Sequence, residues 1–447
     1  MFGNARSSGS KHAACCGLVL VLVPPAFALP VALDRVDGAA ADLAAVPGSA
    51  PLRAVEAPAT PAGEDGEEPR TLPRLLREHV VYLGSFAVPI EDGAGNPLTY
   101  GGHALGHRPG VNSLFFGCHD WFQLLAEVSI PPVGGTATVL QDCTDVTEGT
   151  LSEVDPGDPN GIRLGGHLVH AGRLITSAFA YYDADGTQVV THGVSSSPDL
   201  SQSGDFDGWY GFTGAVAFPR ALAGYMTPIP AEWQPLFGGP AFTGQGSLSI
   251  VGNSSDGPSA TVFDPADVGG GGAIPGTTVV FYPIAHSHPD FEAKGSQLAG
   301  MAFPRGTRTV LFFGTRAQCE YCYGLPQDCP CSCSPYHGPH NHYRHAIWAY
   351  DADHLLRVKN GELEPWEVMP YATWELADIH AGDCASTRYG GATFDPEAGV
   401  LYVVEDYGEN PAVHAFRIDV HGVPGLDPFF VDGFESGDTS AWSSQSP

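Results

Sequence analysis

Residues 389–419 read YGGATFDPEAGVLYVVEDYGENPAVHAFRID, and this stretch contains the pattern that decides the fold. It begins with two glycines and continues with short apolar runs that are separated by turn residues such as Asp-Pro-Glu-Ala-Gly. Short apolar runs bounded by Gly, Pro, Asn and Asp predict β-strands joined by tight turns. The stretch therefore predicts a small antiparallel sheet.

The same order of features recurs along the chain, which indicates an internal repeat. Residues 100–131 (YGGHALGHRPGVNSLFFGCHDWFQLLAEVSIP) and 164–194 (LGGHLVHAGRLITSAFAYYDADGTQVVTHGV) follow it closely. Residues 244–269 form a compressed copy. A further copy starts at LAGMAFP, residues 298–304, and resumes at HAIWAYDADHLL, residues 345–356, after a long insertion. Helix is expected only near residue 352.

A β-propeller is the architecture that these repeats predict. One small sheet leaves two faces uncovered, whereas sheets stacked around an axis cover both faces and leave few open edges. The copies predict five blades, with a weak sixth as an alternative within residues 196–240. Residues 79–89 (HVVYLGSFAVP) precede the first copy and are expected to complete the last blade. A β-sandwich or an irregular pair of sheets is the competing all-β architecture, because the copies are unevenly spaced.

The N-terminal region predicts export. Residues 1–28 contain Arg6 and Lys11, then an apolar run, then Ala-Phe-Ala, which is typical of a secretory signal peptide. The run is shorter than the roughly 20 residues of a membrane-spanning helix, and no comparable run follows. The protein is therefore expected to be secreted. Residues 29–78 are rich in Ala and Pro and predict a disordered linker. The propeller is expected over residues 79–421 and a tail over 422–447.

Export determines how the stretch CEYCYGLPQDCPCSCSPYHGPHNHYRH, residues 319–345, is interpreted. An even number of cysteines remains after the signal peptide, and oxidising compartments favour disulfides. Cys118 and Cys143 form a plausible local pair. A zinc site is the alternative, because Cys319 and Cys322 have ligand spacing and histidines follow them. The cysteines predicted to form disulfides are Cys118, Cys143, Cys319, Cys322, Cys329, Cys331, Cys333 and Cys384.

The charge balance excludes one class of partner. The chain has 50 acidic and 20 basic residues, which gives a net charge of −30. Nucleic-acid binding depends on clustered Lys and Arg, so nucleic acid is not an expected partner. An acidic surface keeps an exported protein in solution, and acidic loops could also bind calcium through oxygen ligands. No stretch matches the spacing of an EF-hand loop, and no other cofactor is predicted.

Several segments resemble secreted bacterial proteins of uncharacterised function that have β-propeller-like repeats. The resemblance rests on residues 118–131, 224–251, 347–374 and 390–403. It implies a bacterial, exported protein with a propeller, and it supplies no catalytic residues. The tail FFVDGFESGDTSAWSSQSP, residues 429–447, resembles the short closing motif of exported bacterial proteins, which implies a sorting or surface tag.

In a propeller, the loops after the second strand of each blade gather on one face. Here these loops carry aromatic and acidic residues, and such a surface suits glycans because aromatic faces pack on sugar rings and carboxylates accept hydroxyl hydrogen bonds. The alternative is that they are ordinary turn residues, as the Asp-Ala-Asp-Gly of residues 183–186 suggests. The predicted ligand-binding residues are Asp120, Trp121, Tyr181, Tyr182, Asp256, Glu405, Asp406 and Tyr407.

The same face could support chemistry. Asp120 and Glu405 are one candidate carboxylate pair for hydrolysis of a glycosidic bond. His103 and His167 each follow a Gly-Gly pair, so they could line the central channel and, together with His119, hold a metal. The alternative is that these histidines are satisfied by backbone partners.

These observations predict an extracellular binding module for a carbohydrate or another extracellular ligand. The first alternative is a glycoside hydrolase or another hydrolase that depends on calcium or carboxylates. The second is a structural cell-surface protein without catalysis. The sequence contains no Gly-x-Ser-x-Gly elbow, phosphate-binding loop or dinucleotide fingerprint.

Overall fold

A computed structural model of the 447-residue chain describes residues 68–419, except 159–160, 184, 247–252, 292–294, 333–336, 380–388 and 406–408. The expected signal peptide, residues 29–67 of the expected linker and the tail lie outside the described residues. Within the described part, no helix is both long and apolar enough to span a membrane.

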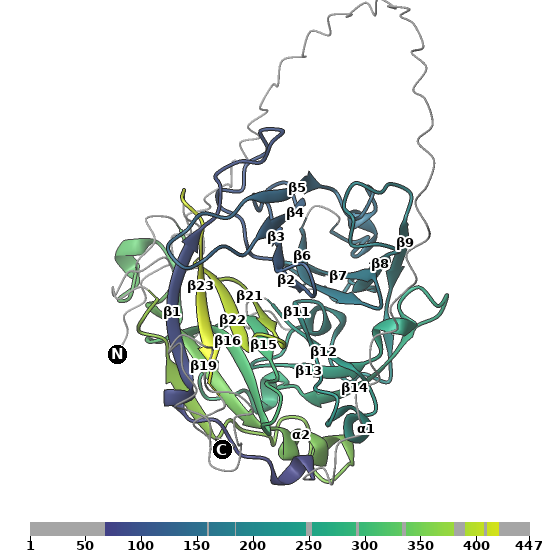
Figure 1. Ribbon diagram of the computed structural model, residues 1–447. Coiled ribbons are helices and arrows are strands. Elements are labelled where there is room, and N and C mark those ends of the chain that lie inside the picture. Colours follow the sequence, from purple (N-terminus) through teal and green to yellow (C-terminus); the bar gives the residue numbers. More distant parts are fainter. Residues whose placement is uncertain are drawn as a thin grey trace, which may run out of the picture. The chain divides into compact units, whose positions relative to one another are not determined.

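The described residues form a five-bladed β-propeller, as predicted (Figure 1). In blades 1, 2 and 4, the first strand in the chain lies nearest the centre. Blade 1 contains β2 (Leu105–Arg108), β3 (Ser113–Gly117), β4 (Leu125–Ser129) and β5 (Val139–Thr144). Blade 2 contains β6 (Ile162–His170), β7 (Arg173–Ala180), β8 (His192–Ser195) and β9 (Phe206–Tyr210). All strand pairs of these two blades are antiparallel.

Blades 3 and 4 contain the α-helices of the described residues. Blade 3 contains β11 (Tyr225–Pro228), β12 (Ala241–Gly244), β13 (Ala260–Phe263) and β14 (Ile274–Val280). The short strand β10 (Phe212–Thr213) pairs parallel with β14. The helix α1 (Gln234–Phe237) lies between β11 and β12 in the chain. Blade 4 contains β15 (Gln297–Ala302), β16 (Thr309–Ala317), β19 (Tyr343–Asp351) and β20 (Ala372–Glu375). The helix expected near residue 352 is α2 (Ala352–Lys359).

The N-terminal strand closes the ring, as predicted. Blade 5 contains β21 (Tyr389–Asp395), β22 (Val400–Glu405), β23 (Ala412–Ile418) and β1 (Val80–Ala87). β1 pairs antiparallel with β23 along its whole length, so hydrogen bonds join the start of the described chain to its end. This pairing also covers the edge that β23 would otherwise expose.

Glycines at the opening of each blade let the inner strands approach one another closely. Contacts run from β2 to β6, β11, β15, β21 and back to β2, which completes the ring. A Cβ atom at Gly300 would lie 2.5 Å from the carbonyl oxygen of Ala392, and one at Gly391 would lie 2.8 Å from that of Gly102. Close packing at these positions therefore explains why glycines mark the repeats, because a larger side chain would not fit.

Separate apolar clusters fill the interfaces between blades. Phe115 of β3 packs toward blade 2 with Leu174, whereas the adjacent Phe116 packs toward blade 5 with Val404. Successive strand residues point to opposite faces, so one apolar strand supplies both interfaces of its blade. The largest cluster lies between blades 3 and 4 and contains Trp348 of β19.

The third repeat differs from the prediction. The sequence places it at residues 244–269 and leaves room for a sixth blade in 196–240. The structure instead begins blade 3 at β11, and β9 in the same range is the outer strand of blade 2, so the described residues contain no sixth sheet in the ring. The sequence feature that marks the start of blade 3 is Leu-Ala-Gly at 222–224. It matches the Leu-Ala-Gly at 298–300 that precedes β16 in blade 4. The short helix α1 interrupts the blade after β11 and obscures the match.

Residues 68–78, which were predicted to belong to the linker, pack against blade 4. Leu72 and Leu75 are buried. The Arg74 guanidinium lies 2.6 Å from a carboxylate oxygen of Asp351, and the backbone N–H of Leu75 donates to Oγ1 of Thr309 at 2.9 Å. The packed domain thus includes residues that precede 79.

Candidate functional site

The loops after the second strands are those in which the ligand-binding residues were predicted. They span residues 118–124, 181–191, 245–259, 318–342 and 406–411 in blades 1 to 5. The side-chain amide of Asn253 in the blade 3 loop donates to the carbonyl oxygen of Asp183 in the blade 2 loop at 2.5 Å. Arg163, at the start of β6, contacts the blade 1 loop. We use the term blade 1–2 rim for Tyr100, His103, residues 119–123, Arg163, Tyr181 and Tyr182.

The blade 1 loop is a hairpin that displays two aromatic side chains. The backbone N–H of Cys118 donates to the carbonyl oxygen of Leu124 at 2.9 Å and closes the loop. Trp121 is 81% exposed and Phe122 is 55% exposed, although both are large apolar groups. The His119 ring lies against both of them, with ring centres 5.3 and 5.5 Å away. This packing orders the aromatic side chains while leaving their outer faces in solvent.

Asp120 is the centre of the polar contacts in this rim. Its Oδ1 lies 3.2 Å from Arg163 Nε and 3.7 Å from His103 Nε2. The Gln123 amide donates to the same oxygen at 3.1 Å, while Gln123 Oε1 accepts from the backbone N–H of Leu164 at 2.6 Å. Asp120 retains 15% of its side-chain exposure. The carboxylate is therefore held in place and still accessible to a ligand.

His103 of the rim and His167 of β6 are electrically neutral. Burial lowers the pKa of His103, against the opposing effect of Asp120, and burial lowers the pKa of His167 to about 3. Within the described residues, both ring nitrogens of His103 and Nε2 of His167 are buried without a hydrogen-bond partner. Nδ1 of His167 lies 3.2 Å from Thr176 Oγ1. These rings therefore offer uncharged lone pairs and N–H groups.

The blade 2 loop adds two tyrosines. The Tyr181 and Tyr182 rings have centres 5.7 Å apart, and the Arg163 guanidinium lies 5.8 Å from the centre of the Tyr181 ring. Both tyrosines are exposed. Asp183, by contrast, is buried and accepts hydrogen bonds from the backbone N–H groups of Thr187 and Gln188. Asp183 therefore acts as an ordinary turn residue, which was the alternative interpretation of residues 183–186.

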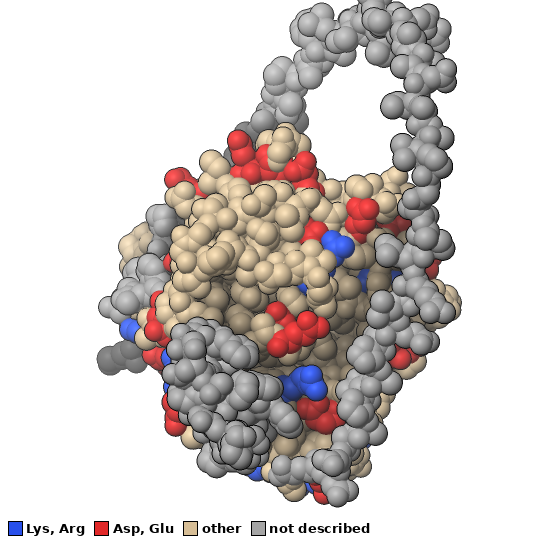
Figure 2. Space-filling model, in the orientation of Figure 1, with Lys and Arg blue, Asp and Glu red and all other residues tan. Residues whose placement is uncertain are grey.

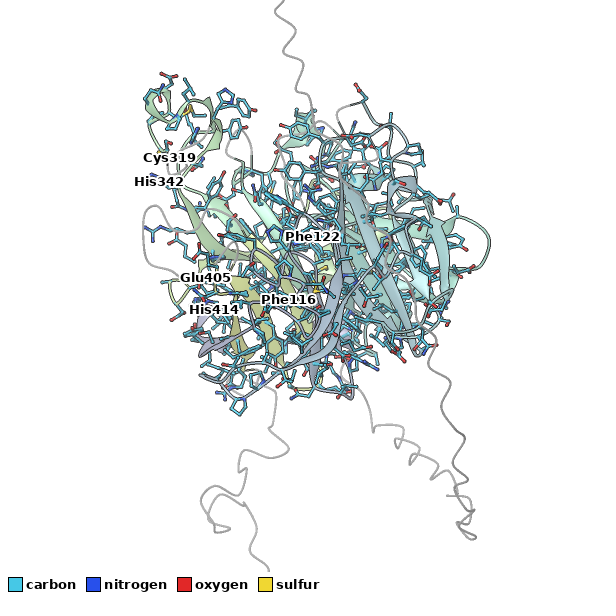
Figure 3. The ribbon with its side chains drawn as sticks, turned by 90° about the horizontal axis from the view of Figure 1, so that it is seen from above. Phe116, Phe122, Cys319, His342, Glu405 and His414 are labelled. Atoms are coloured by element: carbon cyan, nitrogen blue, oxygen red, sulfur yellow. A yellow bond between two sulfur atoms is a disulfide. The ribbon has the colours of Figure 1, made fainter. Side chains whose placement is uncertain are left out.

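The remaining predicted residues lie in other surroundings. Asp256 belongs to the blade 3 loop, where its N–H donates to Tyr282 O and its carbonyl accepts from His288. Glu405 Oε2 lies 3.1 Å from His414 Nε2, whose other nitrogen lies 3.0 Å from the Tyr82 hydroxyl in blade 5. Figure 3 shows Glu405 beside His414, away from Phe122. Asp406 and Tyr407 lie outside the described residues.

The described cysteines form disulfides, as predicted. Cys118 pairs with Cys143, Cys319 with Cys331, and Cys322 with Cys329. Cys333 and Cys384 lie outside the described residues. Among the described residues, the group of three ligand-type side chains with atoms within 4.8 Å of one another is Cys319, Cys331 and His342. Its two sulfur atoms are bonded to each other, so they are not the thiolates that zinc requires. His103, His119 and His167 do not form such a group, and their metal binding stays a prediction.

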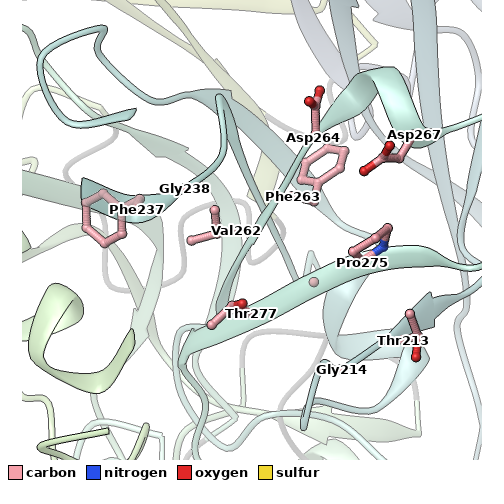
Figure 4. A pocket seen from close by; sticks show the side chains of 11 residues that line it. Thr213, Gly214, Phe237, Gly238, Val262, Phe263, Asp264, Asp267, Pro275 and Thr277 are labelled. Carbon is pink, nitrogen blue, oxygen red and sulfur yellow. The ribbon is translucent and has the colours of Figure 1, made fainter. Parts of the chain in front are cut away.

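A pocket lies elsewhere, in blade 3. It has a volume of about 370 Å³, and its lining includes Thr213 of β10, Val262 of β13 and Thr277 of β14. Figure 4 shows Asp264 and Asp267 on one side of it. Its lining comes from β10, β13, β14, the end of α1 and the turn after β13, so it is separate from the rim. On the face drawn in Figure 2, acidic groups lie at several places, including the middle, and basic groups are fewer.

The chain is similar to several solved structures at low sequence identity. No family model and no curated protein matches the sequence. An arabinanase of Bacillus subtilis shares 12% identity over 74% of this chain and 96% of that chain, with a TM-score of 0.40. An exo-β-1,3-galactanase of Phanerochaete chrysosporium shares 9% identity over 75% of this chain and 63% of that chain, with a TM-score of 0.39.

Sequence reasoning missed Arg163, Gln123 and Phe122. Arg163 lies directly before the Leu-Gly-Gly that opens the second copy, and the whole chain has only 20 basic residues. A rare basic residue at a blade opening was therefore the available signal. No signal in the sequence identified Gln123, because its role depends on a contact with Leu164 of the next blade.

Proposed function

We propose that the blade 1–2 rim binds a neutral carbohydrate. The observation that carries this proposal is the position of Arg163, whose guanidinium contacts the Tyr181 ring and the Asp120 carboxylate. Aromatic faces and oriented polar groups thus lie next to each other, and sugars present both apolar ring faces and hydroxyl groups.

The electrostatics favour a neutral ligand over an anionic one. Arg163 is already paired with Asp120, and the neighbouring histidines are neutral because burial lowers their pKa. The chain as a whole has a net charge of −30. An acidic polysaccharide would be repelled by this charge, whereas a neutral sugar would not.

Binding to immobilised neutral glycans, followed by calorimetry with soluble sugars, tests the proposal. Trp121→Ala should weaken binding by about tenfold or more, because stacking on an exposed indole is lost. Val216→Ala removes another exposed apolar side chain far along the chain and is the control. Binding that is equal in wild type and Trp121→Ala would reject the rim as the site.

A glycoside hydrolase that acts at the same rim is the second candidate. It is favoured by the neutral His103 ring, whose Nε2 lies 3.7 Å from the Asp120 carboxylate, since such a pair can accept or deliver a proton. Turnover of the bound sugars, lost in Asp120→Asn and retained in Asp264→Asn, would support it. Glu405→Gln tests the other carboxylate that the sequence suggested. If the protein neither binds nor hydrolyses these sugars, a structural role is favoured.

A further inference from the structure

Three side chains of metal-ligand type meet in the insertion between β16 and β19. The Sγ atoms of Cys319 and Cys331 and a ring nitrogen of His342 all lie within 4.8 Å of one another. Figure 3 shows Cys319 and His342 next to each other, apart from the rim residue Phe122. All three side chains are partly exposed, so an ion in solution has access to them. The group therefore has the composition of a zinc site, apart from the bond between its two sulfur atoms.

Hydrogen bonds hold Cys319 and His342 together without help from the disulfide. The backbone N–H of Gln318 donates to the carbonyl oxygen of His342 at 2.9 Å. Asn341 is buried, and its side-chain oxygen accepts from the backbone N–H of Cys319 at 2.9 Å. Its amide nitrogen donates to the carbonyl oxygen of Cys319 at 2.8 Å. Two of the three ligands are thus positioned by contacts that do not require the sulfur–sulfur bond.

Separate contacts keep Cys331 close to this pair. The insertion contains β17 (Cys322–Gly324) and β18 (Gly338–His340), which pair antiparallel. Oγ of Ser332, the residue after Cys331, lies 2.8 Å from Nδ1 of His340 in β18. The other ring nitrogen of His340 lies 3.0 Å from a carbonyl oxygen of β17, and the ring is buried. Cys331 therefore stays near the other two ligands after its own disulfide opens.

The spacing of the three ligand atoms fits tetrahedral zinc. Zinc–sulfur bonds of about 2.3 Å and zinc–nitrogen bonds of about 2.0 Å place ligand atoms roughly 3.5 to 3.8 Å apart at tetrahedral angles. The three atoms already lie within 4.8 Å of one another, so small movements bring them to this spacing once the sulfur atoms separate. Zinc accepts thiolate and imidazole ligands, whereas calcium and magnesium prefer oxygen. The net charge of −30 also favours a cation over an anion.

We propose that Cys319, Cys331 and His342 bind zinc when the disulfide is reduced, so that the same two sulfur atoms form either a disulfide or a metal site. A dithiol reductant supplies two electrons, breaks the Cys319–Cys331 bond and becomes a disulfide itself, while the two cysteine sulfur atoms take up its two protons. Zinc binding then releases these protons, and the neutral form of the His342 ring donates a nitrogen lone pair. Water or a ligand from solution takes the fourth position. This site is separate from the carbohydrate-binding rim and does not depend on it.

Zinc titration of the full chain in its oxidised and reduced forms tests this inference. The chain is reduced with dithiothreitol, separated from it by anaerobic gel filtration, and titrated with zinc in a calorimeter, with its free thiols counted beforehand. Reduced wild type should bind zinc at least about tenfold more tightly than oxidised wild type. Cobalt in place of zinc should give a thiolate-to-cobalt charge-transfer absorption band in the reduced form and not in the oxidised form.

Variants of the reduced chain identify the ligands. His342→Ala should weaken zinc binding by about tenfold or more, and His342→Cys should restore it, because a thiolate replaces the imidazole. His337→Ala is the matched control, because His337 is an exposed histidine of the same insertion that does not belong to the group of three. Cys319→Ser with Cys331→Ser should bind zinc weakly with and without prior reduction.

Several results would overturn the proposed zinc site. Equal zinc affinity of oxidised and reduced wild type would show that the disulfide does not control binding. Equal affinity of reduced wild type and reduced His342→Ala would show that other cysteines hold the metal. A disulfide that dithiothreitol does not open in the folded protein, or loss of the fold on reduction, would also contradict the site. The thiol count monitors the disulfide, and circular dichroism monitors the fold.

Discussion

Nε of Arg163, near the start of β6, lies 3.2 Å from Oδ1 of Asp120, in the loop after β3. The pair joins the loop of blade 1 to the inner strand of blade 2. Because Arg163 also lies over the Tyr181 ring, a single guanidinium contacts groups from two other segments of the chain. The geometry of the proposed site therefore depends on how two blades meet.

Replacement of Arg163 should separate binding from stability. Arg163→Gln should weaken glycan binding by about tenfold, because the Asp120 carboxylate and Tyr181 lose their common partner. The free energy of unfolding should change by less than about 1 kcal/mol, because the pair is partly exposed. Calorimetry and urea unfolding measure the two effects. Arg417→Gln breaks the exposed pair with Asp419 and should leave binding unchanged. Binding that is equally unaffected in both variants would contradict the role of Arg163.

Buried neutral histidines should make the fold sensitive to acid. Burial lowers the pKa of His192 from 6.5 to about 3. The unfolded chain therefore binds more protons than the folded chain between these values, so stability falls as pH falls from 6.5 toward about 3. Each unit of pKa difference corresponds to about 1.4 kcal/mol.

His192→Gln isolates this contribution. The His192 ring bonds to Thr191 in its own blade and to Thr243 Oγ1 in blade 3, at 2.9 and 3.0 Å. Near neutral pH the variant should lose about 1 to 3 kcal/mol, because these partners lose hydrogen bonds. The gap to wild type should narrow as pH falls through the window. Urea unfolding over this pH range measures it, and a gap that stays constant would show that His192 is not buried in its neutral form.

The disulfides should differ in their effect on the propeller. Cys118–Cys143 closes a loop of 25 residues within blade 1, so Cys118→Ser with Cys143→Ser should lower the free energy of unfolding by about 3 kcal/mol. Cys319–Cys331 lies within the insertion between β16 and β19, outside the apolar clusters between blades. Cys319→Ser with Cys331→Ser should lower the free energy of unfolding much less, as measured by guanidinium unfolding. Equal losses in the two double variants would indicate that this insertion contributes to the stability of the ring.

Close packing at the centre of the ring should exclude a side chain at Gly300. Gly300→Ala should lower the free energy of unfolding by about 1 to 3 kcal/mol, because its Cβ would meet the backbone of Ala392 in the next blade. Gly272→Ala places a methyl group in open space and is the control, with a change within about 0.5 kcal/mol. Equal midpoints of thermal unfolding for the two variants would argue against the tight contact of β15 with β21.

The sequence predicted most of the fold because the repeats are local. Paired glycines, alternating strands and turn residues indicated the blades, and the strand at 79–89 was correctly expected to close the ring. The third blade was misplaced because α1 separates its first two strands, so the spacing no longer matched the other copies. A short insertion thus concealed a repeat whose opening Leu-Ala-Gly was intact.

The site was predicted less completely. Asp120, Trp121 and Tyr181 were expected to share a surface, and Arg163 connects Asp120 with Tyr181 in the structure. Glu405 is instead bonded to His414 within blade 5. Such contacts depend on which residues of different blades come into register, and this is not visible in a single repeat.

The amino-acid sequence by itself determined the all-β class, the approximate number of blades and the strand that closes them. These features follow from steric and hydrophobic patterns that act over a few residues, such as a glycine at an inner strand or alternation along an outer one. Only the tertiary structure decided that Arg163 meets Asp120 and that it lies over the Tyr181 ring. These contacts depend on the packing of blades around an axis, because that packing brings together groups that are distant along the chain.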